Sequence, residues 1–177
     1  LMHALNQQCR ASSLPSLPED VYITPCGGTK LVGHLASLFL GQEVRPVILL
    51  DGDDAGRVRR DALLKELYVG HDGCIVMLDQ CLARPQSEVE IEDILGEYII
   101  LSALNAILPA PLSLTEVERR DGSVPSQIKA AAKRQGVVLP DGWKTDVALR
   151  LVSSWAQQGV NLPESVLVDA SKLFAEL

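Results

Sequence analysis

Val47-Ile48-Leu49-Leu50-Asp51-Gly52-Asp53-Asp54-Ala55-Gly56-Arg57 runs from four apolar residues directly into an acidic segment with two glycines. A continuous apolar run of this length predicts a strand that is covered on both faces. Open α/β sheets bind their ligands at the carboxyl ends of such strands. Because side chains alternate along an extended backbone, Asp51 and Asp53 are expected on one side of the chain. Gly52 between them permits a close backbone approach.

Outward from this stretch, strand-like and helix-like segments alternate through the first half of the chain. We expect further strands over 21–24 and 74–78, and helices over 1–12, 31–40 and 56–68. Strands separated by helices of this length predict an α/β fold with a mostly parallel sheet flanked by helices.

The second half has helical periodicity almost throughout, interrupted by segments that contain Pro, Gly or Asn. Its expected helices cover 91–107, 113–120, 125–135, 143–157 and 164–176. We therefore expect an α/β core over 1–88 and a helical segment over 89–177 that completes the site and packs on the core.

The acidic segment after the central strand has the chemistry of a site for a hard divalent cation. Mg²⁺ binds through one or two carboxylates together with water and substrate phosphate oxygens, which Asp51 and Asp53 can provide. The alternative is that these acids only cap the helix that follows, since Asp is a favoured N-cap. We expect capping for Asp54 and metal binding for Asp51 and Asp53.

A second acidic cluster, Glu88-Val89-Glu90-Ile91-Glu92-Asp93, follows the strand expected at 74–78. One interpretation is a capping box of Ser87 and Glu90 that opens the long helix. That interpretation leaves Glu92 and Asp93 unexplained. Two acidic groups of this kind fit a two-metal phosphodiesterase, in which one ion activates water and the other stabilises the leaving oxygen. Glu90, Glu92 and Asp93 are therefore candidate metal ligands.

Composition limits the class of protein. Hydrophobic residues make up 47% of the 177 residues and no run of 18 apolar residues occurs, so we expect a folded, soluble chain that does not enter a membrane. The four cysteines lack zinc-like spacing, and we interpret them as reduced thiols of a cytoplasmic protein. A net charge of −7 argues against a general electrostatic grip on nucleic acid, although bound cations would reverse the sign locally.

Three blocks of the sequence together resemble a known family. TPCGGTKLVGHL (24–35), VILLDGDDAGR (47–57) and EVEIEDIL (88–95) are similar to the Toprim domain of OLD (overcoming lysogenization defect) family nucleases. The resemblance covers roughly residues 1–100, and the helical remainder matches more loosely. It implies a Toprim sheet with a helical addition, Mg²⁺- or Mn²⁺-dependent nicking or cutting of DNA with two ions, and an ATPase domain upstream in the same polypeptide.

The resemblance also assigns residues. By position, Asp51 and Asp53 match the Toprim Asp-x-Asp pair, and Glu90, Glu92 and Asp93 match the acids that complete the metal sites. Lys144 lies where the family has a lysine that stabilises phosphate charge, which adds it to Asp51 and Asp53 as a catalytic candidate. A solvated lysine at a helix start is the alternative. The departure is at the start, where the family's first strand and its glutamate are missing, so the chain as given is expected to cut poorly.

Four residues are candidates for contact with the DNA backbone. Gly27 and Gly28 precede a helix and can cradle a phosphate with their N–H groups, or form a plain tight turn. Lys30 follows them, and Arg57 lies just past the acidic segment, where a solvated helix face is the alternative.

Two other functions stay open. A receiver-like signalling domain would use Asp51 as its phosphoryl acceptor, although the long helical second half fits it poorly. A non-catalytic Toprim-like regulatory or interaction domain would tolerate changes at the acidic residues. The oligomeric state is also open, with a homo-oligomer among the alternatives.

Overall fold

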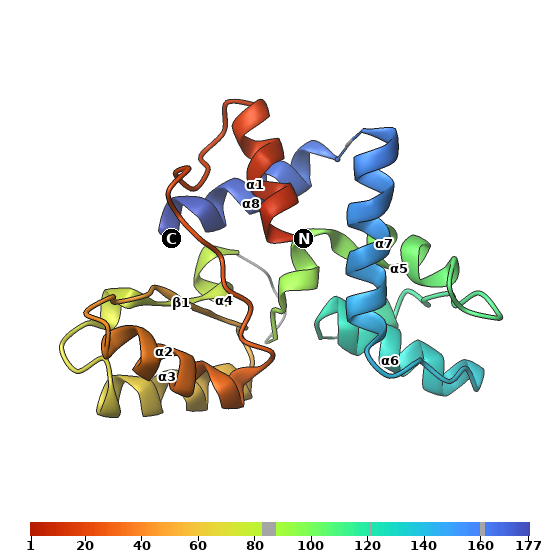
Figure 1. Cartoon of the computed structure of the whole chain (residues 1–177). Helices are drawn as coiled ribbons and strands as arrows, with labels where there is room; N and C mark the ends of the chain where they lie inside the picture. Colours follow the sequence, from red (N-terminus) through yellow and green to blue (C-terminus); the bar gives the residue numbers. More distant parts are fainter. Residues whose placement is uncertain (83–87, 121, 160–161) are drawn as a thin grey trace.

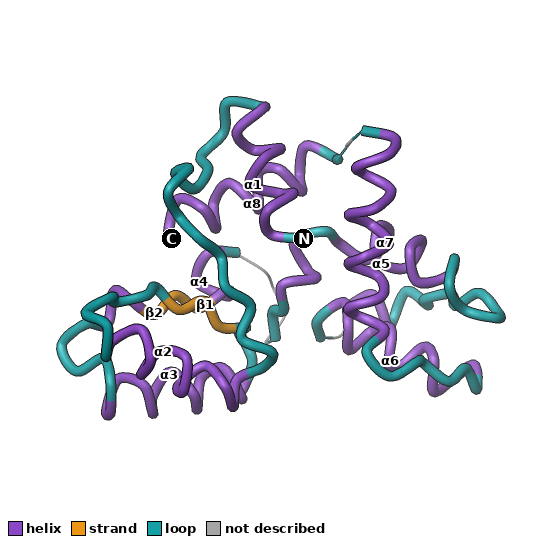
Figure 2. The backbone as a smooth tube through the Cα atoms, in the orientation of Figure 1, coloured by secondary structure: helices purple, strands orange, loops and turns teal. Residues whose placement is uncertain are grey.

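The computed structural model describes residues 1–82, 88–120, 122–159 and 162–177. Over these residues the protein is mixed α/β but mostly helical, with eight α-helices and one small sheet of two parallel strands (Figure 1). The strands occupy a short stretch among the helices (Figure 2). No helix in the described ranges combines the length and apolar character needed to cross a bilayer.

The first half alternates helices with the two strands. In chain order its elements are α1 (Met2–Ala11), α2 (Thr29–Leu40), β1 (Ile48–Leu50), α3 (Asp54–Glu66), η1 (Asp72–Cys74), β2 (Ile75–Met77) and α4 (Leu78–Cys81). The strands are parallel and pair Ile48 with Ile75 and Leu50 with Met77. The parallel β-α-β unit expected around 47–78 is therefore confirmed.

The second half is helical over its described residues. Its elements are η2 (Ile91–Ile94), α5 (Gly96–Asn105), η3 (Glu118–Arg120), α6 (Val124–Gln135), α7 (Trp143–Gln158) and α8 (Glu164–Glu176). The helices expected at 125–135, 143–157 and 164–176 are thus confirmed to within a residue or two.

Three expected elements differ in the structure. The segment 21–24 is not a strand, and Tyr22 in it is exposed. The helix expected over 91–107 is divided at Gly96, whose φ of +75° is a left-handed conformation. The 3-10 turn η2 ends before this residue, and α5 begins at it. The helix expected over 113–120 is only a 3-10 turn over Glu118–Arg120, and the Thr115 hydroxyl and the Glu118 carboxylate, which bond to each other's backbone N–H, place its start after Thr115.

Two apolar cores lie on opposite faces of the sheet. The smaller core joins the sheet to α2 and α3 and consists of Val32, Ala36, Ile48, Leu50, Leu63, Tyr68, Ile75 and Met77. The larger core takes Val76 and Leu78 together with residues of α1, α5, α6, α7 and α8. Figure 1 shows α2 and α3 below the strands and α1 against α8 above them. The helical half and the first helix thus share one core.

Candidate functional site

The acidic segment emerges at the carboxyl end of β1, as the sequence predicts. Leu50 is buried, and Asp51 and Gly52 follow it directly. Gly52 forms an isolated antiparallel bridge with Val89, with N–H···O distances of 2.7 and 3.2 Å. This bridge brings the second acidic cluster to the end of the strand, although 37 positions separate the two residues in sequence.

Both glycines of the segment are sterically required. A Cβ on Gly52 would lie 2.5 Å from the Cβ of Asp79, which follows β2. A Cβ on Gly56 would overlap the carbonyl oxygen of Asp51. The close approach expected at Gly52 is confirmed, and the groups that approach are Asp79 and the Val89 backbone.

Asp51 faces the second acidic cluster. Its Oδ1 accepts a hydrogen bond from the backbone N–H of Ile91 at 3.2 Å. Burial, followed by repulsion from Glu90 and Glu92, raises the pKa of Asp51 to about 6, against an opposing effect of Lys144 and the Ile91 N–H. Ionisation of Asp51 in the folded protein therefore costs free energy, and stability alone would favour a neutral residue there. Such a carboxylate is a candidate for a functional site.

Glu90 is hydrogen-bonded at both carboxylate oxygens. Its Oε1 accepts from the hydroxyl of Ser123 at 2.6 Å, and its Oε2 accepts from the ammonium of Lys144. The same ammonium lies 3.5 Å from Oε2 of Glu92. Burial alone would raise the pKa of Glu90, but the bonds from Lys144 and Ser123 outweigh it and lower that pKa.

Lys144 reaches this cluster from the first turn of α7. Trp143, its neighbour, is buried in the larger core and fixes the start of the helix. A cation in the first turn opposes the helix dipole, so the favourable contacts of Lys144 are those with the glutamates. Burial would lower the pKa of Lys144, but the hydrogen bond to Glu90 and the charges of Glu92, Glu90 and Asp51 raise it.

Asp53, and not the expected Asp54, is the N-cap of α3. The Asp53 Oδ1 accepts from the Gly56 N–H at 2.6 Å. Asp54 is the first residue of the helix, and its exposed carboxylate pairs with Arg57 at 3.3 Å. Helix α3 begins one residue earlier than the expected cap requires, so the interpretation of Asp54 as the cap is wrong. Capping occupies one oxygen of Asp53.

Asp93 holds the backbone of the site together. It is buried, its Oδ2 accepts from the Glu90 N–H at 2.7 Å, and its Oδ1 accepts from the Val124 N–H at 2.8 Å. Glu90 itself is the N-cap of η2, with Asp93 as the returning carboxylate. The capping box expected between Ser87 and Glu90 involves Ser87, which lies outside the described residues. These contacts give Asp93 a structural role, and we leave it out of the proposed ligand set.

The four candidates for DNA contact lie at the starts of α2 and α3. Gly27 and Gly28 have φ of +68° and +118°, and Gly28 is the N-cap of α2. Lys30 is exposed. The Arg57 guanidinium lies 3.3 Å from both the Gly52 carbonyl oxygen and the Asp79 carboxylate, in addition to its pairing with Asp54. Arg57 therefore braces the acidic segment against the end of β2.

Three residues that the sequence reasoning did not select belong to the site or its surroundings. Ser123 is completely buried and caps α6, and the signal for it is a serine two positions before Pro125, a common helix-start pattern. Asp79 has a buried Oδ1 without a hydrogen-bond partner. Lys129 is exposed on α6, and its charge helps to lower the pKa of Glu90. No local pattern distinguishes Asp79 or Lys129 from ordinary surface residues.

The residues present suit a divalent cation in charge and chemistry. Asp51, Glu90 and Glu92 carry carboxylate oxygens of the kind that such ions prefer, and Lys144 balances only one of their three charges. As the side chains stand, no group of three or more His, Cys, Asp or Glu residues in the described ranges is arranged to hold an ion. Ion binding therefore requires that side chains around Lys144 rearrange.

Comparisons of the chain with protein-family models, with curated proteins and with solved structures gave no match.

Proposed function

We propose that the chain is a phosphodiesterase that hydrolyses DNA with Mg²⁺ or Mn²⁺, in the manner of a Toprim-type nuclease of the OLD family. The observation that carries the proposal is the contact of Lys144 with Glu90 and Glu92 at the end of β1, beside Asp51, which accepts a hydrogen bond from the Ile91 N–H of the same acidic cluster. The proposal includes a Toprim-like architecture, two ions, and an ATPase domain of the same polypeptide as partner.

Charge favours this function over a purely structural role. Three carboxylates and one ammonium leave two negative charges in a half-buried space. Burial first, and then repulsion from Glu90 and Glu92, raises the pKa of Asp51 there. A structural ion-pair network would gain from an equal number of cations. With Asp53, four carboxylates balance two divalent ions, and the ammonium of Lys144 then remains to neutralise a phosphate.

Each residue has a role that follows from its position. Asp51, Glu90 and Glu92 provide oxygen ligands, and the second oxygen of Asp53 extends the set toward α3. The Ser123 hydroxyl and the Ile91 N–H orient Glu90 and Asp51. Lys144 supplies positive charge to the phosphate oxygens. The bound ions would lower the pKa of the attacking water and stabilise the leaving oxygen.

Nicking of supercoiled plasmid tests the proposal, with EDTA, Mg²⁺ and Mn²⁺ in parallel and Mn²⁺ binding measured by calorimetry. The expected result is weak nicking that requires metal and that is lost, together with Mn²⁺ binding, in Asp51→Asn and Glu92→Gln. Asp54→Asn is the matched control, because Asp54 is exposed and its carboxylate pairs with Arg57, so it should keep both properties. Nicking that persists in EDTA or in Asp51→Asn would contradict the proposal.

A further inference from the structure

Lys144 is more exposed to solvent than the two glutamates that it contacts. The Lys144 side chain is 34% exposed, whereas those of Glu90 and Glu92 are 15% and 13% exposed. A lysine ammonium on a flexible four-carbon stem gives up one position for another more readily than a carboxylate fixed by its surroundings. Lys144 is therefore the movable member of the cluster.

The ammonium occupies the oxygens that a divalent ion would need. It contacts Oε2 of Glu90 and Oε2 of Glu92. An oxygen that coordinates a metal at about 2.1 Å leaves little space for an ammonium on the same side.

Glu90 keeps a second, fixed partner. Ser123 donates to Oε1 at 2.6 Å, is completely buried, and is anchored as the N-cap of α6. Departure of Lys144 would leave Oε2 open while Ser123 still holds the carboxylate in place. Glu90 thus keeps the hydrogen bond from Ser123, whereas the one from Lys144 can exchange.

We propose that Lys144 is an internal counter-ion that a divalent cation displaces from Glu90 and Glu92, and that its displacement makes the ammonium available to the substrate phosphate. The inference rests on the proposed function, because it concerns metal binding at the same site. It makes metal loading and phosphate binding sequential, since one ammonium cannot serve the glutamates and the phosphate together. Ser123 is a positioning residue in this exchange.

Mn²⁺ affinity, measured by calorimetry at constant pH and salt, tests the exchange. Lys144→Met removes the competitor, and we expect Mn²⁺ to bind about tenfold tighter, the order expected for one charge-assisted hydrogen bond. Ser123→Ala should bind Mn²⁺ more weakly. Lys144→Arg, whose guanidinium holds carboxylates with two hydrogen bonds, should also bind it more weakly and keeps the test open if the Met variant does not fold. Lys172→Met, on α8 and paired with Asp169, is the matched control.

The opposite changes in Mn²⁺ affinity expected for Lys144→Met and Ser123→Ala distinguish the exchange from a purely structural role of Lys144. If Lys144 only held the site in shape, Lys144→Met and Ser123→Ala would both weaken Mn²⁺ binding, and the inference would be overturned while the proposed function stood. If neither the unmodified chain nor any variant bound Mn²⁺, both would be overturned. Tighter binding in Lys144→Met accompanied by slower plasmid nicking is the result that supports both steps of the exchange.

Discussion

Replacement of Asp51 by Asn should stabilise the metal-free protein. Burial and the neighbouring glutamates raise the pKa of Asp51 from 3.8 to about 6. Ionisation of the folded chain is therefore disfavoured by about two pKa units, which correspond to about 3 kcal/mol at 1.36 kcal/mol per unit. Partial solvent exposure reduces the figure, so we expect a gain of about 1–3 kcal/mol at pH 8. Asn keeps an oxygen for the Ile91 N–H.

The sign of the pH dependence follows from the same shift. Between pH 3.8 and about 6 the folded chain binds more protons at Asp51 than the unfolded chain does, so this group lowers stability as the pH rises. Above about pH 6 its contribution is constant. The advantage of Asp51→Asn should therefore be largest at pH 8 and fall to about a third of that value at pH 4.5.

Urea unfolding in EDTA at the two pH values measures this effect. Asp54→Asn is the control with the opposite expected sign, because Asp54 is exposed in the first turn of α3, where negative charge is favourable. Addition of Mn²⁺ should stabilise the unmodified protein and leave Asp51→Asn unchanged. A loss of stability in Asp51→Asn at pH 8, or an advantage that does not grow with pH, would refute the electrostatic reasoning.

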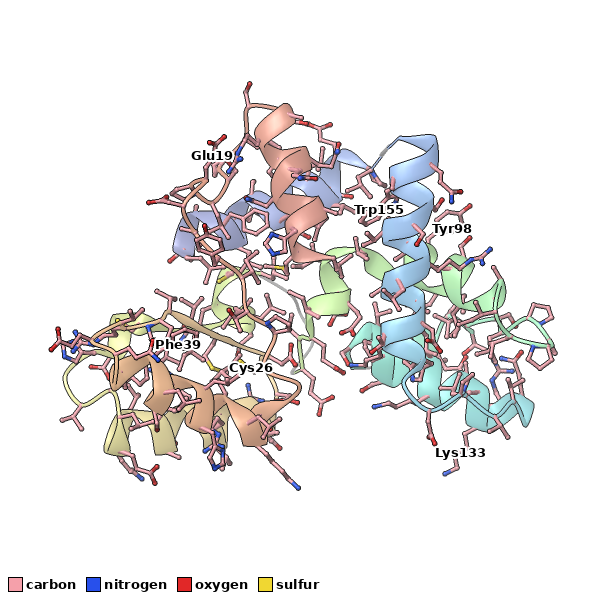
Figure 3. All side chains as sticks on the ribbon, in the orientation of Figure 1. Glu19, Cys26, Phe39, Tyr98, Lys133 and Trp155 are labelled. Atoms are coloured by element: carbon pink, nitrogen blue, oxygen red, sulfur yellow. The ribbon has the colours of Figure 1, made fainter. Side chains whose placement is uncertain are left out.

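Three further sets of substitutions test other parts of the structure. Asp53→Asn retains an N-cap and should fold with nearly unchanged stability in urea while losing nicking, whereas Asp53→Ala should lose both nicking and about 1 kcal/mol. Gly52→Ala should destabilise the protein by several kcal/mol because its Cβ would meet Asp79, and Gly73→Ala, with open space around it, should not. Lys129 and Lys133 are exposed one turn apart on α6, and Lys133 projects from the helix (Figure 3). Their joint replacement by Ala should lower the salt slope of DNA binding by about 1.8, and an unchanged slope would exclude them as phosphate contacts.

Local patterns in the sequence predicted most of the helices and the two strands. The apolar run before Asp51 identified β1, and the spacing of apolar residues identified α6, α7 and α8. These helices and strands depend on residues that are close in the sequence, and the periodicity of the apolar residues reflects that local dependence. The expected strand at 21–24 failed because a strand also needs a partner across the sheet, and among the described residues β1 and β2 pair only with each other.

The candidate site was only partly predictable for the same reason. The position of Asp51 at a strand end follows from its immediate neighbours. The contact of Lys144 with Glu90 spans 54 positions, and that of Ser123 with Glu90 spans 33. No periodicity encodes contacts at such separations. The choice between Asp53 and Asp54 as the N-cap depended on a single residue of register, since the two side chains are chemically equivalent caps.

The packing of α1 against α8 has a consequence for synthesis on the ribosome. The Cys9 thiol lies 3.7 Å from the carbonyl oxygen of Leu167, a separation of 158 positions. The core around the sheet uses residues between Val32 and Met77 and can assemble early in translation. The contacts between α1 and α8 can form only after α8 has left the ribosome. Apolar surface that waits for its partner in this way favours aggregation of a nascent chain.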